Sequence, residues 1–208
     1  MTLKVHHLNN SRSQRILWLL EELGAEYEIV HHQRDAVTNL APSELCAIHP
    51  LGKSPMIEDD GKIVTESAAI VEYLCERHGG SSFVPERGTD DHIRYLEWLH
   101  FAEGSAMTPI LLNLYTSRLG EGGAPLRPRI DHQLQSHFQY MEDSLSPSGY
   151  FVGDSLTGAD IMLSFPAEAA IKMGLAADKP KLTSYVAAIH ARPTYQAALA
   201  KGGPYAYA

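Results

Sequence analysis

Cysteine is scarce in this sequence: its 208 residues include two, Cys46 and Cys75. They lie far apart, without the CxxC spacing of redox motifs or the repeated pairs of zinc sites. A fold stapled by disulfides needs several closely spaced cysteines, so we expect a chain that relies on its own core in a reducing compartment, the cytoplasm. Both thiols are expected to be buried apolar groups.

Long hydrophobic runs are absent as well. No segment reaches the roughly 18 apolar residues that a membrane span requires, so no membrane association is expected. The run from Leu3 to His7 is not part of a long apolar stretch followed by a small-residue cleavage site, which is what a secretory signal would show. The sequence thus indicates neither a membrane protein nor a secreted one.

Positive charge is also limited, because 17 lysines and arginines face 25 aspartates and glutamates, a formal net charge of -8. The basic residues are scattered rather than clustered, whereas a surface that follows a phosphate backbone needs them together. We therefore expect no nucleic-acid partner.

Eleven histidines could suggest a metal site, but none of them forms an HxxxH pair. The two adjacent pairs, His6-His7 and His31-His32, fall in strand-like segments, where neighbouring side chains point to opposite faces of the sheet. No metal is expected.

The composition is that of an ordinary globular protein, with 44% hydrophobic and 20% charged residues. In the first third, short β-rich runs alternate with helical periodicity. This pattern predicts, in order, a strand Leu3–His7, a helix Ser11–Leu23 ended by Gly24, a strand Tyr27–His31, a helix over 42–48, a hairpin at Asp60-Gly61 and a helix Glu66–Arg77. We expect a mixed domain over residues 1–79.

A linker over residues 80–89 leads to residues 90–208, where β-type patterns nearly vanish. Long helical periodicity replaces them, clearest at Ile130, Leu134, Phe138, Met141 and Leu145. Pro109 is expected to kink a helix, and Thr157 with Asp160 forms a capping motif at a helix start. The predicted fold class is α+β, a mixed domain followed by an all-α domain.

Three motifs follow one another in the mixed domain: Ser11-Arg12-Ser13-Gln14-Arg15, then Pro50-Leu51-Gly52-Lys53-Ser54-Pro55, then Glu66-Ser67. In this order the chain resembles the glutathione S-transferase family, in particular its bacterial and fungal serine-type, theta-like and phi-like members. The resemblance covers the whole chain, because the first domain is similar to the family's thioredoxin-like domain and the remainder to its all-helical C-terminal domain. It implies glutathione as co-substrate, no metal, and a homodimer.

The family's chemistry requires a group that holds the glutathione thiol as a thiolate near neutral pH. Ser11 lies between the first strand and the first helix, where its hydroxyl and the helix N-terminus both favour a sulfur anion. Ser13 is the alternative donor, and Ser11 as an ordinary helix N-cap is the structural alternative. Ser11 is preferred because it matches the family's serine four residues before an arginine, Arg15. Classes that use tyrosine carry it at the end of the first strand, where this chain has His6 and His7.

The resemblance assigns glutathione-binding roles to Lys53, Ser54, Pro55, Glu66 and Ser67. Pro55 is expected to be a cis-proline, which turns the backbone of Ser54 toward the peptide part of glutathione. Lys53 matches the position that neutralises the glycine carboxylate. Glu66 and Ser67 open a helix, whose N–H groups and serine hydroxyl suit the γ-glutamyl carboxylate while Glu66 faces the ammonium.

The second substrate, a small electrophile, is expected in a pocket between the two domains. The helix that carries Pro109 offers Met107, Ile110, Leu111 and Tyr115 for its lining, although each could equally be a core residue. The predicted function is conjugation of the glutathione thiolate to small hydrophobic electrophiles, a detoxification reaction, with glutathione peroxidase as an accompanying activity. The alternative is a non-catalytic protein of the same fold that binds glutathione or regulates a stress response.

Overall fold

The computed structural model describes residues 3–208 and divides into two compact units. The first contains the residues up to Val84 together with His190–Ala208, and the second contains Pro85–Ile189.

A four-stranded mixed sheet forms the centre of the first unit. Its strands are β1 (Leu3–Leu8), β2 (Tyr27–His32), β3 (Met56–Asp59) and β4 (Lys62–Thr65), in the order β2-β1-β3-β4. β1 is parallel to β2, β3 is antiparallel to β1, and β3 and β4 form a hairpin. The predicted order of strand, helix, strand, helix, hairpin and helix is confirmed, and it is a thioredoxin-like arrangement.

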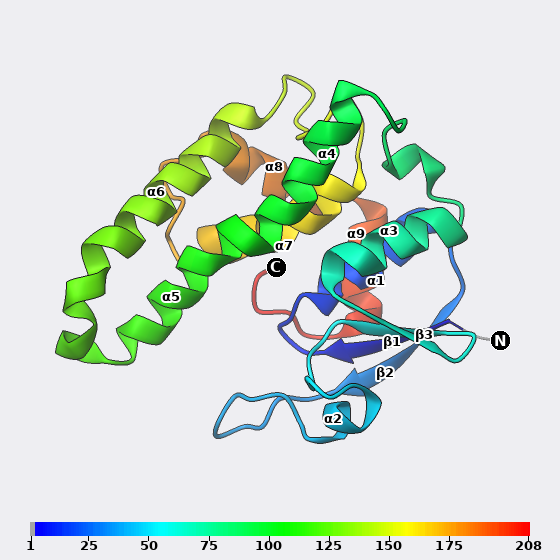
Figure 1. Cartoon of the computed structure of the whole chain (residues 1–208), viewed down its shortest axis with the longest axis horizontal. Coiled ribbons are helices and arrows are strands. Elements are labelled where there is room, and N and C mark those ends of the chain that lie inside the picture. The colour runs from blue at the N-terminus through cyan, green and yellow to red at the C-terminus, as the bar shows by residue number, and fades with distance from the viewer. Residues whose placement is uncertain (1–2) are drawn as a thin grey trace. The chain divides into compact units, whose positions relative to one another are not determined.

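Helices cover both faces of this sheet. Figure 1 shows α1 (Ser13–Leu23), α3 (Ser67–Arg77) and α9 (Pro193–Gly202) on one face and the short α2 (Glu44–Ile48) on the other. The first eight residues of α1 are all buried, because α1 lies between β1 and the two neighbouring helices. Gly24 ends α1 in the left-handed conformation, with a φ of 62°, as the sequence predicts.

The C-terminal segment belongs to the first unit, whereas the sequence placed it in the helical domain. Its helix α9 packs on α1, where the buried rings of Trp18 and Tyr195 meet edge to face with centroids 5.6 Å apart. The Arg192 guanidinium also pairs with the Glu22 carboxylate, with Nε 2.6 Å from Oε1. Contacts between residues so far apart in sequence leave no local periodicity, so the pattern could not place α9.

The two cysteines differ in environment. Cys75 is buried in α3, and burial raises the pKa of its thiol to about 12. The expectation that Cys46 is buried is wrong, because its side chain is exposed. The helix that carries it, α2, has five residues and buries Leu45 alone.

The second unit is helical, as predicted. Its main helices are α4 (Asp90–Phe101), α5 (Met107–Ser117), α6 (Arg127–Ser144), α7 (Gly158–Lys172) and α8 (Pro180–His190), while short 3-10 helices span Ser81–Phe83 in the first unit and Gly120–Leu126 in the second. The helix α7 is buried from Gly158 to Ala170 and packs on α4 and α5. Thr157 and Asp160 form the predicted capping box at its start. No helix in the described part of the chain is long and apolar enough to cross a membrane.

A π-helical turn, Ala102–Ala106, separates α4 from α5, and Pro109, where a kink is expected, follows it within α5. Pro109 is the third residue of α5 and has no N–H to donate, so the carbonyl of Ser105 lacks its usual partner within the helix. The ring of His137, on α6, contacts that carbonyl instead, with Nδ1 3.2 Å from the oxygen. This contact joins the π-helical turn to α6.

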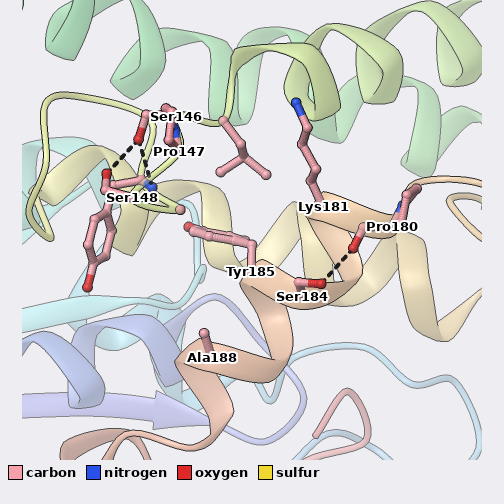
Figure 2. Close-up of a pocket in the computed structure, with 11 residues that line it drawn as sticks. Ser146, Pro147, Ser148, Pro180, Lys181, Ser184, Tyr185 and Ala188 are labelled. Atoms are coloured by element: carbon pink, nitrogen blue, oxygen red, sulfur yellow. Dashed lines mark hydrogen bonds between the residues drawn. The ribbon is translucent and has the colours of Figure 1, made fainter.

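A cavity of about 760 Å³ lies in the second unit between α8 and the loop that follows α6. Figure 2 shows that Tyr185, Lys181 and Ser184 reach it from α8, while Ser146 and Ser148 reach it from the loop. The serine hydroxyls of the loop bond to each other at 2.6 Å.

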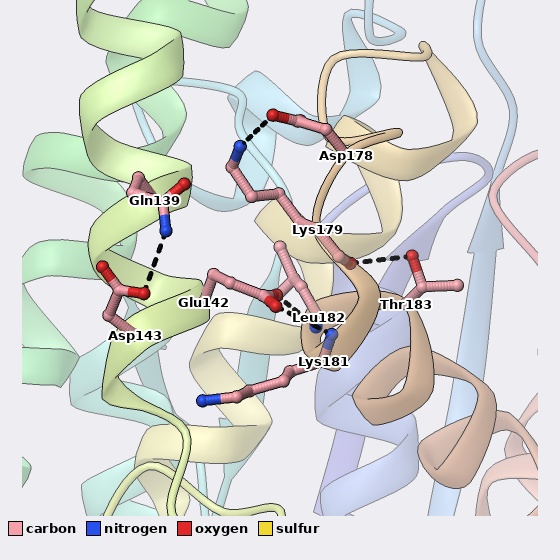
Figure 3. Close-up of polar contacts among 8 residues, drawn as sticks. All are labelled: Gln139, Glu142, Asp143, Asp178, Lys179, Lys181, Leu182 and Thr183. Atoms are coloured by element: carbon pink, nitrogen blue, oxygen red, sulfur yellow. Dashed lines mark hydrogen bonds and ion pairs between the residues drawn. The ribbon is translucent and has the colours of Figure 1, made fainter.

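Glu142 fixes the start of α8, as Figure 3 shows. Its buried carboxylate accepts the backbone N–H of Lys181 at 3.0 Å and that of Leu182 at 2.8 Å. These two donors have no partner inside the helix, so an acidic side chain from α6 satisfies them and complements the helix dipole.

Candidate active site

The three motifs singled out in the sequence meet at one edge of the sheet. His6 of β1 lies opposite Met56 of β3, and Met56 lies opposite Thr65 of β4. The segment Ser54-Pro55 comes just before Met56, and Glu66-Ser67 comes just after Thr65. The connection from β1 to α1, with its two serines, starts from the same edge. Strand register therefore brings together segments that are far apart in sequence.

A chain of hydrogen bonds links Ser11, Ser13 and His7 at this edge. The two serine oxygens are 2.8 Å apart, and the oxygen of Ser13 is 2.9 Å from Nδ1 of His7. All three side chains are buried, with 5% of Ser11, 0% of Ser13 and 3% of His7 exposed. The ring of His7 thereby reaches Ser11 through one intervening hydroxyl.

The surroundings of the two hydroxyls differ. The oxygen of Ser13 also accepts the N–H of Leu8 at 3.2 Å and lies 3.3 Å from the carbonyl of Leu8, so its hydrogen-bonding capacity is filled. The oxygen of Ser11 accepts the N–H of Ser13 at 3.2 Å and contacts the Ser13 hydroxyl. A hydroxyl offers one donor and two acceptor positions, so Ser11 has capacity for one further partner.

Ser11 also contributes to the start of α1. The helix begins at Ser13, with Arg12 as the flanking residue, and the Ser11 hydroxyl takes up the N–H of the first helical residue. Ser11 therefore accepts a backbone N–H at the start of α1, as a capping residue does, but the N-cap position itself is Arg12.

Burial keeps the His7 ring neutral. The pKa of His7 is lowered to about 4, chiefly by burial and also by the nearby His31, although a backbone hydrogen bond with Gly202 acts in the opposite direction. A neutral imidazole carries one ring proton, so one of its nitrogens donates while the other accepts.

The residues before Ser11 are held by two other segments. Asn10 adopts a left-handed conformation with a φ of 50°, and its side-chain oxygen accepts the N–H of Ala206, in the C-terminal tail, at 2.7 Å. Arg34 donates to the carbonyls of Asn9 and Asn10 at 3.1 and 3.3 Å. These bonds fix the turn that delivers Ser11 to the helix start.

The bond between Ser54 and Pro55 is cis, as the sequence predicts. The hydroxyl of Ser54 donates to the carbonyl of His6 at 2.9 Å, which ties this loop to β1. Pro55 is buried, Ser54 is half-buried and Lys53 is exposed. Solvent therefore reaches Lys53 and part of Ser54 in this loop.

Glu66 and Ser67 stand at the start of α3. Glu66 has a φ of 66°, a conformation that non-glycine residues rarely adopt, and its side chain is exposed, whereas Ser67 is buried. The first N–H groups of α3 have no partner within the helix, and Glu66 makes no side-chain capping bond to them. This helix start suits an anionic group.

The residues expected to line the electrophile pocket follow one another along α5. Met107 is 3% exposed and Tyr115 is 55% exposed, with Leu111 between these extremes. Their spacing of four residues places them along one side of the helix. None of them lines the cavity of Figure 2.

No cluster of three or more histidine, cysteine or acidic side chains able to hold a metal ion occurs among residues 3–208. The histidines at the ends of β1 and β2 contact each other in pairs instead: the rings of His6 and His32 have nitrogens 3.2 Å apart, and His7 and His31 meet edge to face.

The sequence did not indicate the link between His7 and Ser13. The signal available was a histidine at the end of the first strand, in the position where tyrosine-using classes carry their tyrosine, with two serines close behind it. Only the fold of the connecting turn shows that Ser13, rather than Ser11, faces the ring.

A sheet of this order with a cis-proline before β3, joined in one chain to an all-helical unit, defines a two-domain protein with a thioredoxin-like first domain. Two family models match the chain: "Glutathione S-transferase, N-terminal domain" over residues 1–76 and "Glutathione S-transferase, C-terminal domain" over residues 121–202.

Curated and solved relatives agree with these matches. Glutathione S-transferase 1 of Saccharomyces cerevisiae is 34% identical, with 96% of this chain and 94% of that protein covered. Glutathione S-transferase 3 of Schizosaccharomyces pombe is 35% identical, with 80% and 73% covered. The crystal structure of a glutathione S-transferase from Actinobacillus pleuropneumoniae matches with a TM-score of 0.88 at 34% identity, covering 99% of this chain and 94% of the other. The chain belongs to the glutathione S-transferase family.

Proposed function

We propose that this enzyme conjugates glutathione to small electrophiles and that Ser11 is the catalytic residue that holds the sulfur as a thiolate. The observation that carries the proposal is the contrast between the two hydroxyls at the start of α1. Ser13 is surrounded by His7, Ser11 and the backbone of Leu8, whereas Ser11 has capacity for one more hydrogen bond. A sulfur anion is a suitable acceptor for that bond, and the helix N-terminus adds favourable potential.

The reaction needs no redox partner. The glutathione thiol loses its proton to solvent, and the thiolate is stabilised by the Ser11 hydroxyl. A sulfur lone pair then forms the new bond to the electrophilic carbon, and the leaving group departs with the electrons of the broken bond. Peroxidase activity is proposed as an accompanying activity: the same thiolate attacks a peroxide oxygen, the O–O bond breaks and an alcohol leaves, and a second glutathione then converts the resulting sulfenic acid to glutathione disulfide and water.

The glutathione peptide is proposed to lie along the sheet edge that carries the three motifs. The backbone of Ser54, turned by Pro55, pairs with the peptide, and Lys53 faces the glycine carboxylate. Glu66 and Ser67, at the start of α3, take the ammonium and carboxylate of the γ-glutamyl group. The exposure of Lys53 and Glu66 and the open helix start support these assignments.

The electrophile is proposed to contact Met107, Leu111 and Tyr115 of α5. A side of α5 that passes from a buried methionine to an exposed tyrosine offers apolar surface with a polar end, which suits a hydrophobic substrate. We further propose a homodimer in the cytoplasm, on the basis of family membership.

The test combines retention on immobilised glutathione with conjugation of a chromogenic aryl halide. Retention with turnover supports the transferase. Retention without turnover on any of a panel of aryl halides, epoxides and hydroperoxides would instead favour the non-catalytic glutathione-binding alternative. Sedimentation at micromolar concentration tests the dimer, which a monomer of 22.9 kDa would contradict.

A further inference from the structure

The hydrogen-bond chain from His7 through Ser13 to Ser11 can point in two directions. In one direction, Ser13 donates its proton to Nδ1 of His7, and Ser11 donates its own proton to Ser13. In the other direction, Nδ1 of His7 donates to Ser13, Ser13 donates to Ser11, and the Ser11 proton points away from the chain. Each serine has one proton, so the two arrangements exclude each other.

Only the second direction suits a thiolate on Ser11. The sulfur anion accepts hydrogen bonds and donates none, so it needs the Ser11 proton. In the first direction that proton is already used by Ser13. The oxygen of Ser11 then presents only its lone pairs, which repel an anion.

The ring of His7 selects between these directions because it terminates the hydrogen-bond chain at the end opposite Ser11. Ser13 could instead send its proton to the Leu8 carbonyl, at 3.3 Å, but a ring with an acceptor at Nδ1 would then be left without a donor in a buried position. A ring that carries its proton on Nδ1 leaves every member of the chain satisfied and frees the proton of Ser11.

The backbone contact with Gly202 places an opposing influence on the ring. The backbone of Gly202, at the end of α9, is a second hydrogen-bond partner of the ring. A neutral ring has one proton, so a partner that accepts this proton competes with Ser13 for it. An anion at Ser11 favours the arrangement with the ring proton on Nδ1.

We propose that His7 is a positioning residue for the glutathione sulfur: by holding its ring proton on Nδ1, it directs the hydroxyl of Ser13 toward Ser11 and the hydroxyl of Ser11 toward the thiolate. This inference rests on the proposed role of Ser11. It predicts that a side chain without a polar group at the position of Nδ1 leaves the Ser11 hydroxyl wrongly oriented for part of the time.

The test uses two polar substitutions of similar character. Asparagine places its amide close to the position of Nδ1, whereas glutamine places it close to that of Nε2. The pKa of the thiol of bound glutathione is read from thiolate absorbance across pH, and affinity is measured with S-methylglutathione, which has no thiol proton. His7→Gln should raise the thiol pKa by about one unit, equivalent to about tenfold less thiolate below that pKa. His7→Asn should stay within a few tenths of a unit of the parent.

His31→Gln is the matched control, because its ring touches His7 but makes no hydrogen bond to Ser13. It should leave the thiol pKa within a few tenths of a unit of the parent, and S-methylglutathione should bind all variants within about twofold. This affinity also reports that each variant is folded.

A double variant separates this inference from the role of Ser11. If His7 acts through Ser11, then His7→Gln adds nothing to Ser11→Ala. A parent-like thiol pKa in His7→Gln, equal shifts in both His7 variants, or additive shifts in the double variant would each overturn the role of His7. If Ser11→Ala itself leaves the pKa unchanged, the proposed role of Ser11 fails, and this inference fails with it.

Discussion

The hydroxyl oxygens of Ser11 and Ser13 lie 2.8 Å apart, yet only Ser13 contacts His7. Ser13, the first residue of α1, thus lies in the middle of the hydrogen-bond chain, and Ser11 lies at one end of it. This division of roles makes the two serines experimentally separable, although they are neighbours.

Ser11→Ala should raise the thiol pKa of bound glutathione while leaving affinity for S-methylglutathione nearly unchanged. Losing a hydrogen bond to a charged group costs about 1.5 to 3 kcal/mol, which corresponds to about one to two pKa units and a ten- to hundredfold lower conjugation rate. Because Ser11 also accepts the N–H of Ser13, a stability loss of about 1 kcal/mol is expected, so melting is measured alongside.

Ser13→Ala is the companion variant, with a different expected profile. It removes the acceptor for the N–H of Leu8 and the partner of His7, so its main effect should be on stability, at about 1 to 3 kcal/mol. A shift of the thiol pKa in Ser13→Ala alone, with none in Ser11→Ala, would reverse the two roles.

Lys53→Ala should raise the KM for glutathione about three- to tenfold with little change in kcat. The proposed contact with a carboxylate remote from the sulfur is made equally in the ground state and the transition state, so it contributes to binding and not to the chemical step. The side chain is exposed, which keeps the effect modest. Lys62→Ala, at another exposed lysine, is the control and should leave both constants unchanged. A large fall in kcat at saturating glutathione would mean that Lys53 acts on the sulfur.

Much of this architecture could be predicted from the sequence, since local signals define it. Gly24 in a left-handed conformation, the hairpin at Asp60-Gly61 and the capping box at Thr157 each depend on a few neighbouring residues. The cis bond at Pro55 was predicted from the family resemblance and is confirmed.

The features that escaped prediction depend on distant partners. Tyr195 packs on Trp18 from the far end of the chain, which moves α9 into the first unit. Cys46 is exposed because the short helix α2 buries Leu45 and not Cys46. The apolar pattern over residues 42–48 does not show which of its side chains faces the core. The partner of Ser13 was invisible because it depends on how the turn after β1 folds.

Tyr195→Ala should destabilise the first unit by about 3 to 5 kcal/mol, because it leaves a large cavity against Trp18 in a fully buried interface. Tyr195→Phe keeps the ring and should lose less than about 1.5 kcal/mol. Urea denaturation followed by tryptophan fluorescence measures both. Equal losses in the two variants would show that the hydroxyl, rather than the ring, holds α9 in place.

The stability of the enzyme should fall in acid through His7. Its pKa is about 4 in the folded protein, lowered by burial, against about 6.5 in the unfolded chain. Between these values the unfolded chain binds more protons, so the free energy of unfolding rises with pH. The contribution of His7 is therefore complete above pH ~6.5 and is lost as pH falls to ~4, with a total of about 3 kcal/mol. Urea denaturation at a series of pH values, compared between the parent and His7→Gln, isolates this contribution, since glutamine does not titrate. Parallel stability profiles for the two proteins would show that His7 is not held neutral, and the two-direction hydrogen-bond chain would then lose its basis.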